Sequence, residues 1–311
     1  MTEPKFNIPW MRWRVPLVGI SIALVLISII DIAWNGLTLG LDFTGGTLVE
    51  TRFEEPADPE VVRRTLEDAG FADGVVQLFG SERDVLVRMP PQAEGDQAKL
   101  GDAIVATLRD AFGDVTLVQS NFVGPVVGEQ LRDEAFLAIL AALAVIMVYV
   151  FFRFTKHFAI SSVAALAHDV ILVFGVFSLF HWTFDLSVLA AVLAVVGYSI
   201  NDSIVVADRI RENFRIMRRA TPIEVVNTSL NQVMARSLIT SGTTLLTLIA
   251  LLIVGGETIR GFALALTIGI TVGTYSSIFV VASSVIFMNM RREDVVPPVD
   301  DEKKEIEEGP V

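Results

Sequence analysis

The stretch VPLVGISIALVLISIIDIAW, at residues 15–34, decides the fold class of this chain. A helix needs about 20 mostly apolar residues to cross the hydrocarbon core of a bilayer, and this run has that length and composition. A small-residue cleavage site does not follow it, because Asn35, Gly36 and Leu37 come next. The run therefore predicts a membrane-spanning helix that is retained as an anchor, not a cleaved signal peptide.

Further apolar segments of the same kind follow toward the C-terminus. They are residues 136–152, 158–180, 186–206, 238–254 and 262–288. The composition agrees, because 52% of the 311 residues are hydrophobic, only 19% are charged, and the mean hydropathy is +0.58. These values predict a polytopic membrane protein, mainly α-helical, with six transmembrane helices. The chain has no cysteine, which excludes disulfides, thiolate catalysis and cysteine-based metal sites.

The basic residues between the spans indicate how the chain is oriented. In a six-span topology they gather on one side: Lys5, Arg12, Arg14, Arg153, Lys156, Arg209, Arg211, Arg215, Arg218, Arg219, Arg291 and Arg292. The two short connections on the opposite side carry only Arg260. Because cytoplasmic loops are enriched in Lys and Arg, both termini are predicted to be cytoplasmic. We therefore expect a cytoplasmic N-terminus at 1–14, an outside domain at 35–132, five helices within 133–290 and an acidic cytoplasmic tail at 291–311.

The outside domain has its own pattern of strands and helices. Alternating residues predict a strand at 37–53, broken by Gly45-Gly46, and strands at 75–79, 84–89 and 115–122. Helices are predicted at 61–69, after an N-cap at Asp58, and at 97–112, before Gly113. The order βαββαβ is that of a ferredoxin-like α+β domain.

Two charged residues are expected inside the membrane. Ionisable groups at the centre of a spanning helix cost about 2.5–3.5 kcal/mol on insertion scales, so each needs an explanation. Asp202 lies within the fourth span, and Arg236 begins a polar stripe with Thr240, Thr243 and Thr247 in the fifth. The two spans meet the same surface, so Asp202 and Arg236 are predicted to pair. The pair is either a proton relay, which we favour, or a static ion pair that fixes helix register.

Two other spans carry polar or small residues. His168 and Asp169 lie near the middle of the third span, and His is the side chain that titrates near neutral pH. A structural hydrogen bond between helices is the favoured interpretation, and both residues stay candidates for a proton path. In the sixth span, Gly269, Gly273 and Ser277 form a small-xxx-small repeat, which indicates close helix packing.

Several function classes are excluded by missing motifs. The sequence has no Walker loop and no His-Glu-x-x-His, and its histidines are too scattered for a metal site. Gly197-Tyr198-Ser199 is not a nucleophile elbow, because Asn201 stands where the second glycine would be. The arginines at 209–219 directly follow a span, which indicates topology and contact with membrane lipid, not nucleic acid. No enzyme activity and no cofactor are expected, with protons as the coupling ion.

Four segments carry a family resemblance. They are LGLDFTGG at 39–46, VGPVVGEQL at 123–131, GYSINDSIVVADRIREN at 197–213, and RS at 236–237 with TSGTTLL at 240–246. They resemble signatures of the bacterial SecD/SecF protein-export family, which is related to the RND superfamily of efflux pumps. The match runs to Met290, and the short outside domain is similar to the SecF branch. The acidic residues at 300–308 lie outside the pattern and are predicted to be disordered.

The resemblance implies a partner and a task. It implies a subunit that forms a heterodimer with SecD beside the SecYEG channel and other Sec auxiliary subunits, in the bacterial cytoplasmic (inner) membrane. There it would use proton motive force in late steps of preprotein translocation. It assigns Asp202 and Arg236 to the proton path, with Asn201, Thr240 and Thr243 nearby. The family motif and hinge would comprise Asp42, Gly45, Gly46, Gly124, Pro125 and Gly128.

Two alternatives from other function classes remain open. One is a half-size transporter for lipids or small molecules, which needs a binding pocket in the outside domain, although fewer than about 100 residues leave little room for one. The other is a scaffold subunit that transports nothing and only stabilises a partner. The scaffold predicts that charge-neutral changes at Asp202 and Arg236 have no effect.

Overall fold

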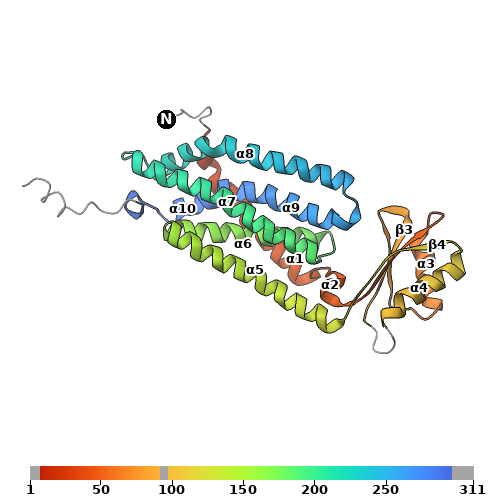
Figure 1. Cartoon of the computed structure of the whole chain (residues 1–311). Coiled ribbons are helices and arrows are strands. Elements are labelled where there is room, and N and C mark those ends of the chain that lie inside the picture. Colours follow the sequence, from red (N-terminus) through yellow and green to blue (C-terminus); the bar gives the residue numbers. More distant parts are fainter. Residues whose placement is uncertain (1–7, 92–96, 296–311) are drawn as a thin grey trace, which may run out of the picture.

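The computed structural model describes residues 8–91 and 97–295, so the acidic tail at 300–308 lies outside the described residues. It shows a long bundle of helices with a small α/β domain at one end (Figure 1). The short N-terminal helix η1 (Trp10–Trp13) and the end of the last long helix lie at the opposite end of the bundle. Both ends of the described chain are therefore remote from the α/β domain.

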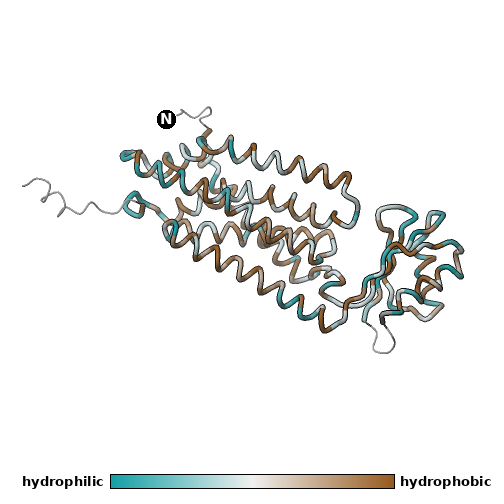
Figure 2. Tube along the Cα trace, viewed as in Figure 1, coloured by the Kyte–Doolittle hydropathy of each residue, from teal (hydrophilic) through white to brown (hydrophobic). Residues whose placement is uncertain are grey.

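Six membrane-length helices form the bundle. They are α1 (Arg14–Asn35), α5 (Pro125–Arg153), α6 (Lys156–Leu179), α7 (Leu186–Ile216), α8 (Pro222–Val254), and a sixth that joins α9 (Glu257–Ser276), the π-helical η2 (Ser277–Val281) and α10 (Ala282–Phe287). Among the described residues these six are long and apolar enough to cross a membrane. Hydrophobic residues run along them (Figure 2). The predicted spans are confirmed, each lying within one of these helices to within a residue.

The helices α7 and α8 continue well beyond their apolar runs. They form an antiparallel hairpin at the end of the bundle remote from the α/β domain (Figure 1). A capping box starts α8, because Thr221 accepts a hydrogen bond from the Glu224 amide while the Glu224 carboxylate accepts one from the Thr221 amide at 2.8 Å. Apolar residues then bury the hairpin: Ile210, Phe214, Val225, Val226 and Leu230. Burial on one face, not bilayer length, sets where these helices end.

The α/β domain has the predicted ferredoxin-like topology. Its elements are α2 (Leu41–Thr44), β1 (Gly46–Phe53), α3 (Pro59–Asp68), β2 (Val75–Phe79), β3 (Ser81–Met89), α4 (Gln97–Phe112) and β4 (Val115–Val123). The antiparallel sheet has the order β2-β3-β1-β4. The core between sheet and helices contains Val49, Val62, Leu66, Val85, Val87, Ile104 and Leu108. The order βαββαβ is thus confirmed.

One predicted element is wrong. Residues 37–45 do not belong to the first strand, because β1 starts at Gly46 and residues 41–44 form the short helix α2. The reason is packing, since Leu41 and Phe43 are buried and Phe43 stacks on Phe184, with ring centroids 5.9 Å apart. Phe184 lies two residues before the start of α7, so this segment packs on the helix bundle instead of extending the sheet.

Small residues let the sixth helix approach its neighbours closely. A Cβ atom added at Gly269 would lie 2.2 Å from a methyl group of Val195, and one at Gly273 would lie 3.2 Å from Ser199. Both contacts are with α7, which confirms the packing predicted from the small-xxx-small repeat. The buried polar groups described next lie in this seam.

Candidate functional site

Asp202 lies where α7 meets α8 and the π-helical segment η2. Its Oδ1 accepts a hydrogen bond from Ser237 of α8 at 2.6 Å, and its Oδ2 accepts one from Ser277 of η2 at 2.5 Å. Both serines are buried and Asp202 is partly buried. Two neutral hydroxyls therefore satisfy the carboxylate from two neighbouring helices, so its charge state bears on how three helices pack.

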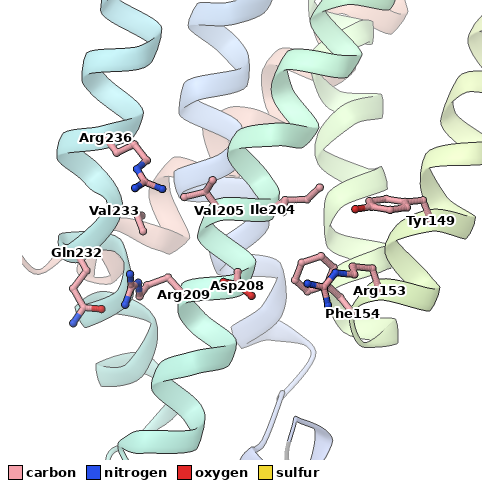
Figure 3. A pocket seen from close by; sticks show the side chains of 10 residues that line it. All are labelled: Tyr149, Arg153, Phe154, Ile204, Val205, Asp208, Arg209, Gln232, Val233 and Arg236. Carbon is pink, nitrogen blue, oxygen red and sulfur yellow. The ribbon is translucent and has the colours of Figure 1, made fainter. Parts of the chain in front are cut away.

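The predicted pairing of Asp202 with Arg236 is wrong in this structure. Among the ion pairs of the described residues, none joins these two side chains. Neighbouring residues on a helix point about 100° apart, and it is Ser237 that faces Asp202. Arg236 extends instead into a cavity between α7 and α8 (Figure 3).

That cavity has a volume of about 370 Å³ and lies in the half of the bundle remote from the α/β domain. Its lining comes from three helices: Tyr149, Arg153 and Phe154 at the end of α5, Ile204, Val205, Asp208 and Arg209 from α7, and Gln232, Val233 and Arg236 from α8 (Figure 3). Arg209 also pairs with Glu212 at 2.9 Å. Val205 follows Asp202 by three residues, so the cavity comes within one helical turn of the buried acid.

The polar stripe predicted on α8 is present and faces out of the chain. Thr240, Thr243 and Thr247 are exposed, and the hydroxyls of Thr243 and Thr247 donate to carbonyls of their own helix. Arg236 and Asn201 are exposed as well. Thr243 and Thr247 satisfy their hydroxyls within the helix, but an exposed arginine in hydrocarbon is costly, so this face of α7 and α8 is suited to contact with another protein.

Asp169 on α6 is a second buried acid, with 1% of its surface exposed. Its Oδ2 accepts hydrogen bonds from Ser199 of α7 at 2.6 Å and from Ser276 of α9 at 2.9 Å. Its Oδ1 lies 2.9 Å from Nδ1 of His168, which is also buried. The hydrogen bonds between helices that we favoured for this pair are therefore present, and the two neighbours also contact each other.

Comparison with known proteins identifies the family. A family model described as "Protein export membrane protein SecD/SecF, C-terminal" matches residues 103–291, and one described as "SecD/SecF GG Motif" matches residues 35–57. The chain belongs to the SecD/SecF family. Protein translocase subunit SecF of Vibrio alginolyticus is 46% identical over 98% of this chain and 97% of its own length. The same subunit of Pseudomonas aeruginosa is 48% identical over 90% of this chain and 92% of its own length.

Solved structures of the SecD/SecF family share the fold. The crystal structure of SecDF, a translocon-associated membrane protein from Thermus thermophilus, matches 94% of this chain with a TM-score of 0.84 and 39% identity. A SecDF crystal structure in a super-membrane-facing form matches 99% of it with a TM-score of 0.67 and 38% identity. The chain spans 40% and 41% of these two longer chains.

The SecD/SecF GG motif joins the α/β domain to the bundle. Gly45 has φ 68° and ψ 177°, and a Cβ atom on it would lie 2.8 Å from Cα of Pro125, the first residue of α5. A Cβ atom on Gly128 would lie 2.8 Å from the Gly45 amide nitrogen. Gly46, with φ 115°, passes so close to the Met89 carbonyl that a Cβ atom would lie 2.2 Å from its oxygen. The two predicted hinge segments therefore pack directly on each other. Gly124 between them has open space around it.

Hydrogen bonds fasten the same junction on its other sides. The Asp42 carboxylate accepts from the Leu186 amide at the start of α7, at 3.0 Å. The Arg88 guanidinium, from β3, donates to the Leu39 carbonyl at 2.7 Å and to the Thr44 hydroxyl at 2.6 Å. Burial lowers the pKa of the Arg88 guanidinium below its usual value. The GG segment of this SecD/SecF chain is thus bonded to the sheet and to α7.

Sequence reasoning missed that serines bind the two acids, and it missed Arg88. Ser237, Ser276 and Ser277 bind the two buried acids, but a serine in a spanning helix is also common at plain packing contacts. Their position along the membrane helices could have pointed to two of them, because Ser276 and Ser277 lie at the level in the sixth span where it passes Asp169 and Asp202. No sequence feature pointed to Arg88, because it lies in a strand of alternating residues and the sequence did not indicate what the outward-facing residues of that strand contact.

Proposed function

We propose that this chain is a SecF-type subunit of the Sec protein translocase. With SecD it couples proton motive force to late steps of preprotein translocation across the bacterial cytoplasmic membrane, beside the SecYEG channel. Both termini are cytoplasmic and the α/β domain is outside. It acts as a transport subunit and not as an enzyme, with protons as the coupling ion. The names of its relatives as translocase subunits support the assignment.

The observation that carries the coupling step is the geometry of Asp202. When the carboxylate is charged it accepts hydrogen bonds from both Ser237 and Ser277, which holds α8 and η2 against α7. Protonation leaves one strong acceptor fewer, so one of these contacts weakens and the helices repack. In this proposal, the cavity one turn away is where protons enter from the cytoplasmic side on their way to Asp202. Moving one charge through the membrane potential releases about 2.3 kcal/mol per 100 mV, which is enough to offset a modest free-energy difference between two conformations.

SecD is the partner that the exposed polar face fits. Asn201 and Arg236 with Thr240 and Thr243 are exposed on one side of this chain, within the predicted spans of α7 and α8 or next to them. A second helix bundle would remove that cost, and Arg236 would then meet polar groups of the partner in an enclosed space. The fused SecDF of Thermus thermophilus, 40% identical to this chain, supports this arrangement.

The junction at the GG motif provides a route from the bundle to the α/β domain. Asp42 contacts the first residue of α7, the helix that carries Asp202, while Gly45 packs on the first residue of α5. Repacking of α7 therefore reaches the α/β domain through hydrogen bonds and backbone contacts. Its movement would act on the preprotein as it emerges outside.

The test is export driven by an imposed proton gradient in membrane vesicles that contain the assembled complex. Asp202→Asn should abolish the gradient-dependent part of preprotein export while the protein remains inserted. Asp31→Asn is the matched control, because Asp31 is a partly buried acid in another spanning helix, α1, and its carboxylate accepts a hydrogen bond from Asn35 of that same helix. Full gradient-driven export by Asp202→Asn would refute the proposal.

The same strains separate the alternatives. A half-size transporter predicts that deletion leaves export intact and makes a lipid or dye accumulate. The cavity described above lies in the half of the bundle remote from the α/β domain, whereas a half-size transporter needs a pocket in the α/β domain itself. A scaffold predicts normal export with charge-neutral changes at Asp202 and Arg236, provided that the complex still assembles.

A further inference from the structure

The proposed coupling step leaves the second buried acid, Asp169, without a task. It lies deep in the bundle, 1% exposed, and accepts hydrogen bonds from Ser199 on α7 and Ser276 on α9. An ionisable group in a membrane helix is expensive, so it indicates a functional site unless packing alone accounts for it. The arrangement of its donors relative to those of Asp202 provides such a function.

The helix α7 and the sixth helix both take part in the two acid sites. The helix α7 carries Asp202 itself and, three residues earlier, Ser199, which donates to Asp169 at 2.6 Å. The sixth helix carries Ser276, which donates to Asp169 at 2.9 Å, and next to it Ser277, which donates to Asp202 at 2.5 Å. One helical turn therefore separates the two carboxylate sites along α7.

The adjacent serines couple the two sites mechanically. Neighbouring residues on a helix point about 100° apart, so Ser276 faces α6 while Ser277 faces α7. Both belong to one stretch of backbone, and a rotation that takes Ser277 away from Asp202 also displaces Ser276 relative to Asp169. The π-helical segment begins at Ser277 itself. Such segments inside α-helices are frequent at functional sites, because the extra residue changes the register of the turn.

We propose that Asp169 is a positioning residue that sets the register of the π-helical segment against Asp202. The proposal rests on the proposed function. When Asp202 takes up a proton, Ser277 is released and η2 rotates. The Asp169 carboxylate, bound to Ser199 and Ser276, stabilises the original register and restores it when the proton leaves. The transported proton binds at Asp202 alone, and Asp169 sets how readily it binds.

Other titratable and charged groups lie on the helices that carry or bind the two acids, or line the cavity one turn from Asp202. They are His168 on α6, Tyr198 and Asp208 with Arg209 on α7, Arg236 on α8, Tyr275 on α9, and Tyr149 with Arg153 on α5. The Tyr275 hydroxyl donates to the Leu17 carbonyl of α1 at 2.8 Å and contacts the Ser21 hydroxyl at 2.9 Å. His168 contacts Asp169 directly, and its ring stacks on Tyr275 with centroids 6.4 Å apart.

The experiment measures the pH profile of gradient-driven export by the assembled complex in membrane vesicles. The decisive variant is Ser276→Ala, with Asp169→Asn beside it and Ser276→Thr as the variant that keeps the hydroxyl. The matched control is Ser283→Ala, because Ser283 is as buried as Ser276, at 0% exposure, lies seven residues further along the same helix and has no hydrogen-bond partner for its hydroxyl. Both changes remove one hydroxyl from a closed seam.

Ser276→Ala and Asp169→Asn should shift the pH midpoint of driven export by about one pH unit, a tenfold change in proton affinity. Ser276→Thr and Ser283→Ala should keep the original midpoint. A purely structural role predicts that Ser276→Ala lowers the amplitude and leaves the midpoint in place, and that result would overturn the proposal. If Asp169→Asn does not assemble, Ser276→Ala decides alone.

Asp202→Asn keeps the two proposals separable. Full driven export by that variant would remove the proposed function together with the role of Asp169. Loss of driven export in Asp202→Asn, combined with an unchanged midpoint in Ser276→Ala, would remove the role of Asp169 alone.

Discussion

Replacing Gly45 with alanine should loosen the junction between the α/β domain and the helix bundle. The backbone of Gly45, at φ 68° and ψ 177°, lies in a region that is essentially open only to glycine. A Cβ atom there would also lie 2.8 Å from Cα and 3.1 Å from N of Pro125, which are backbone atoms that cannot turn away. The substitution therefore combines backbone strain with a steric clash.

The two contributions can be separated with a second glycine. Gly36 has nearly the same backbone conformation, φ 72° and ψ −171°, but nothing lies within 4 Å of its Cβ position. Gly36→Ala should carry only the backbone cost, about 1–3 kcal/mol. Gly45→Ala should add a clash of about 1–3 kcal/mol. The difference corresponds to a factor of roughly 5 to 150 in the equilibrium for local opening, since 1.4 kcal/mol is tenfold.

Hydrogen exchange followed by mass spectrometry, on the full chain in lipid nanodiscs, measures that opening. Gly45→Ala should speed exchange in peptides from β1 and from the first turns of α5, and Gly36→Ala should leave the α5 peptides as in the unmodified protein. Equal exchange at α5 in the two variants would show that the contact between Gly45 and Pro125 does not hold the junction together.

Three further predictions concern the α/β domain, each checked by thermal unfolding or proteolysis. Burial, and to a lesser extent the nearby Asp84 carboxylate, raises the pKa of Glu50 above 4.5, so the charged form of Glu50 opposes folding at neutral pH. Glu50→Gln should therefore raise the unfolding temperature at pH 7, and this gain should disappear below pH 4.5. The hydrogen bond from Arg52 lowers the pKa of Asp84 below 3.8. The charged Asp84 carboxylate therefore stabilises the fold above that pH, and this stabilisation is lost as the pH falls through the folded-state pKa. Asp84→Asn should make acid unfolding less steep in that range. Arg88→Ala leaves the Leu39 carbonyl and the Thr44 hydroxyl without their hydrogen-bond donor, which should cost about 1–3 kcal/mol of stability and speed proteolysis of residues 36–46. Arg83→Ala, on the exposed part of the same strand, should not change the rate of proteolysis.

The membrane helices could be predicted from sequence because a bilayer imposes a minimum apolar length on each of them. The α/β topology could be predicted because alternation and caps such as Asp58 are local signals. The helix at 41–44 could not, because Phe43 is buried against Phe184, a residue more than a hundred positions away. Long-range contacts of this kind override local alternation.

The candidate site was predictable in part for a similar reason. Asp202 was found because an acid in an apolar span is unusual, and the structure places it in a seam of three helices. Its partner was predicted wrongly, because the rotation of each helix about its own axis decides whether Arg236 or Ser237 faces α7. Hydropathy gives the depth of a residue and carries little information on that rotation.

The short connection from β4 to α5 determines how far a small tilt of α5 moves the α/β domain. Only Gly124 separates the last residue of the sheet, Val123, from the first residue of α5. With 29 residues, α5 is about 44 Å long. A tilt of about 10° around its far end would swing the attached strand by about 8 Å, which exceeds the spacing between neighbouring strands. A helix of this length therefore magnifies a small displacement near its far end into a movement of several ångströms at the α/β domain.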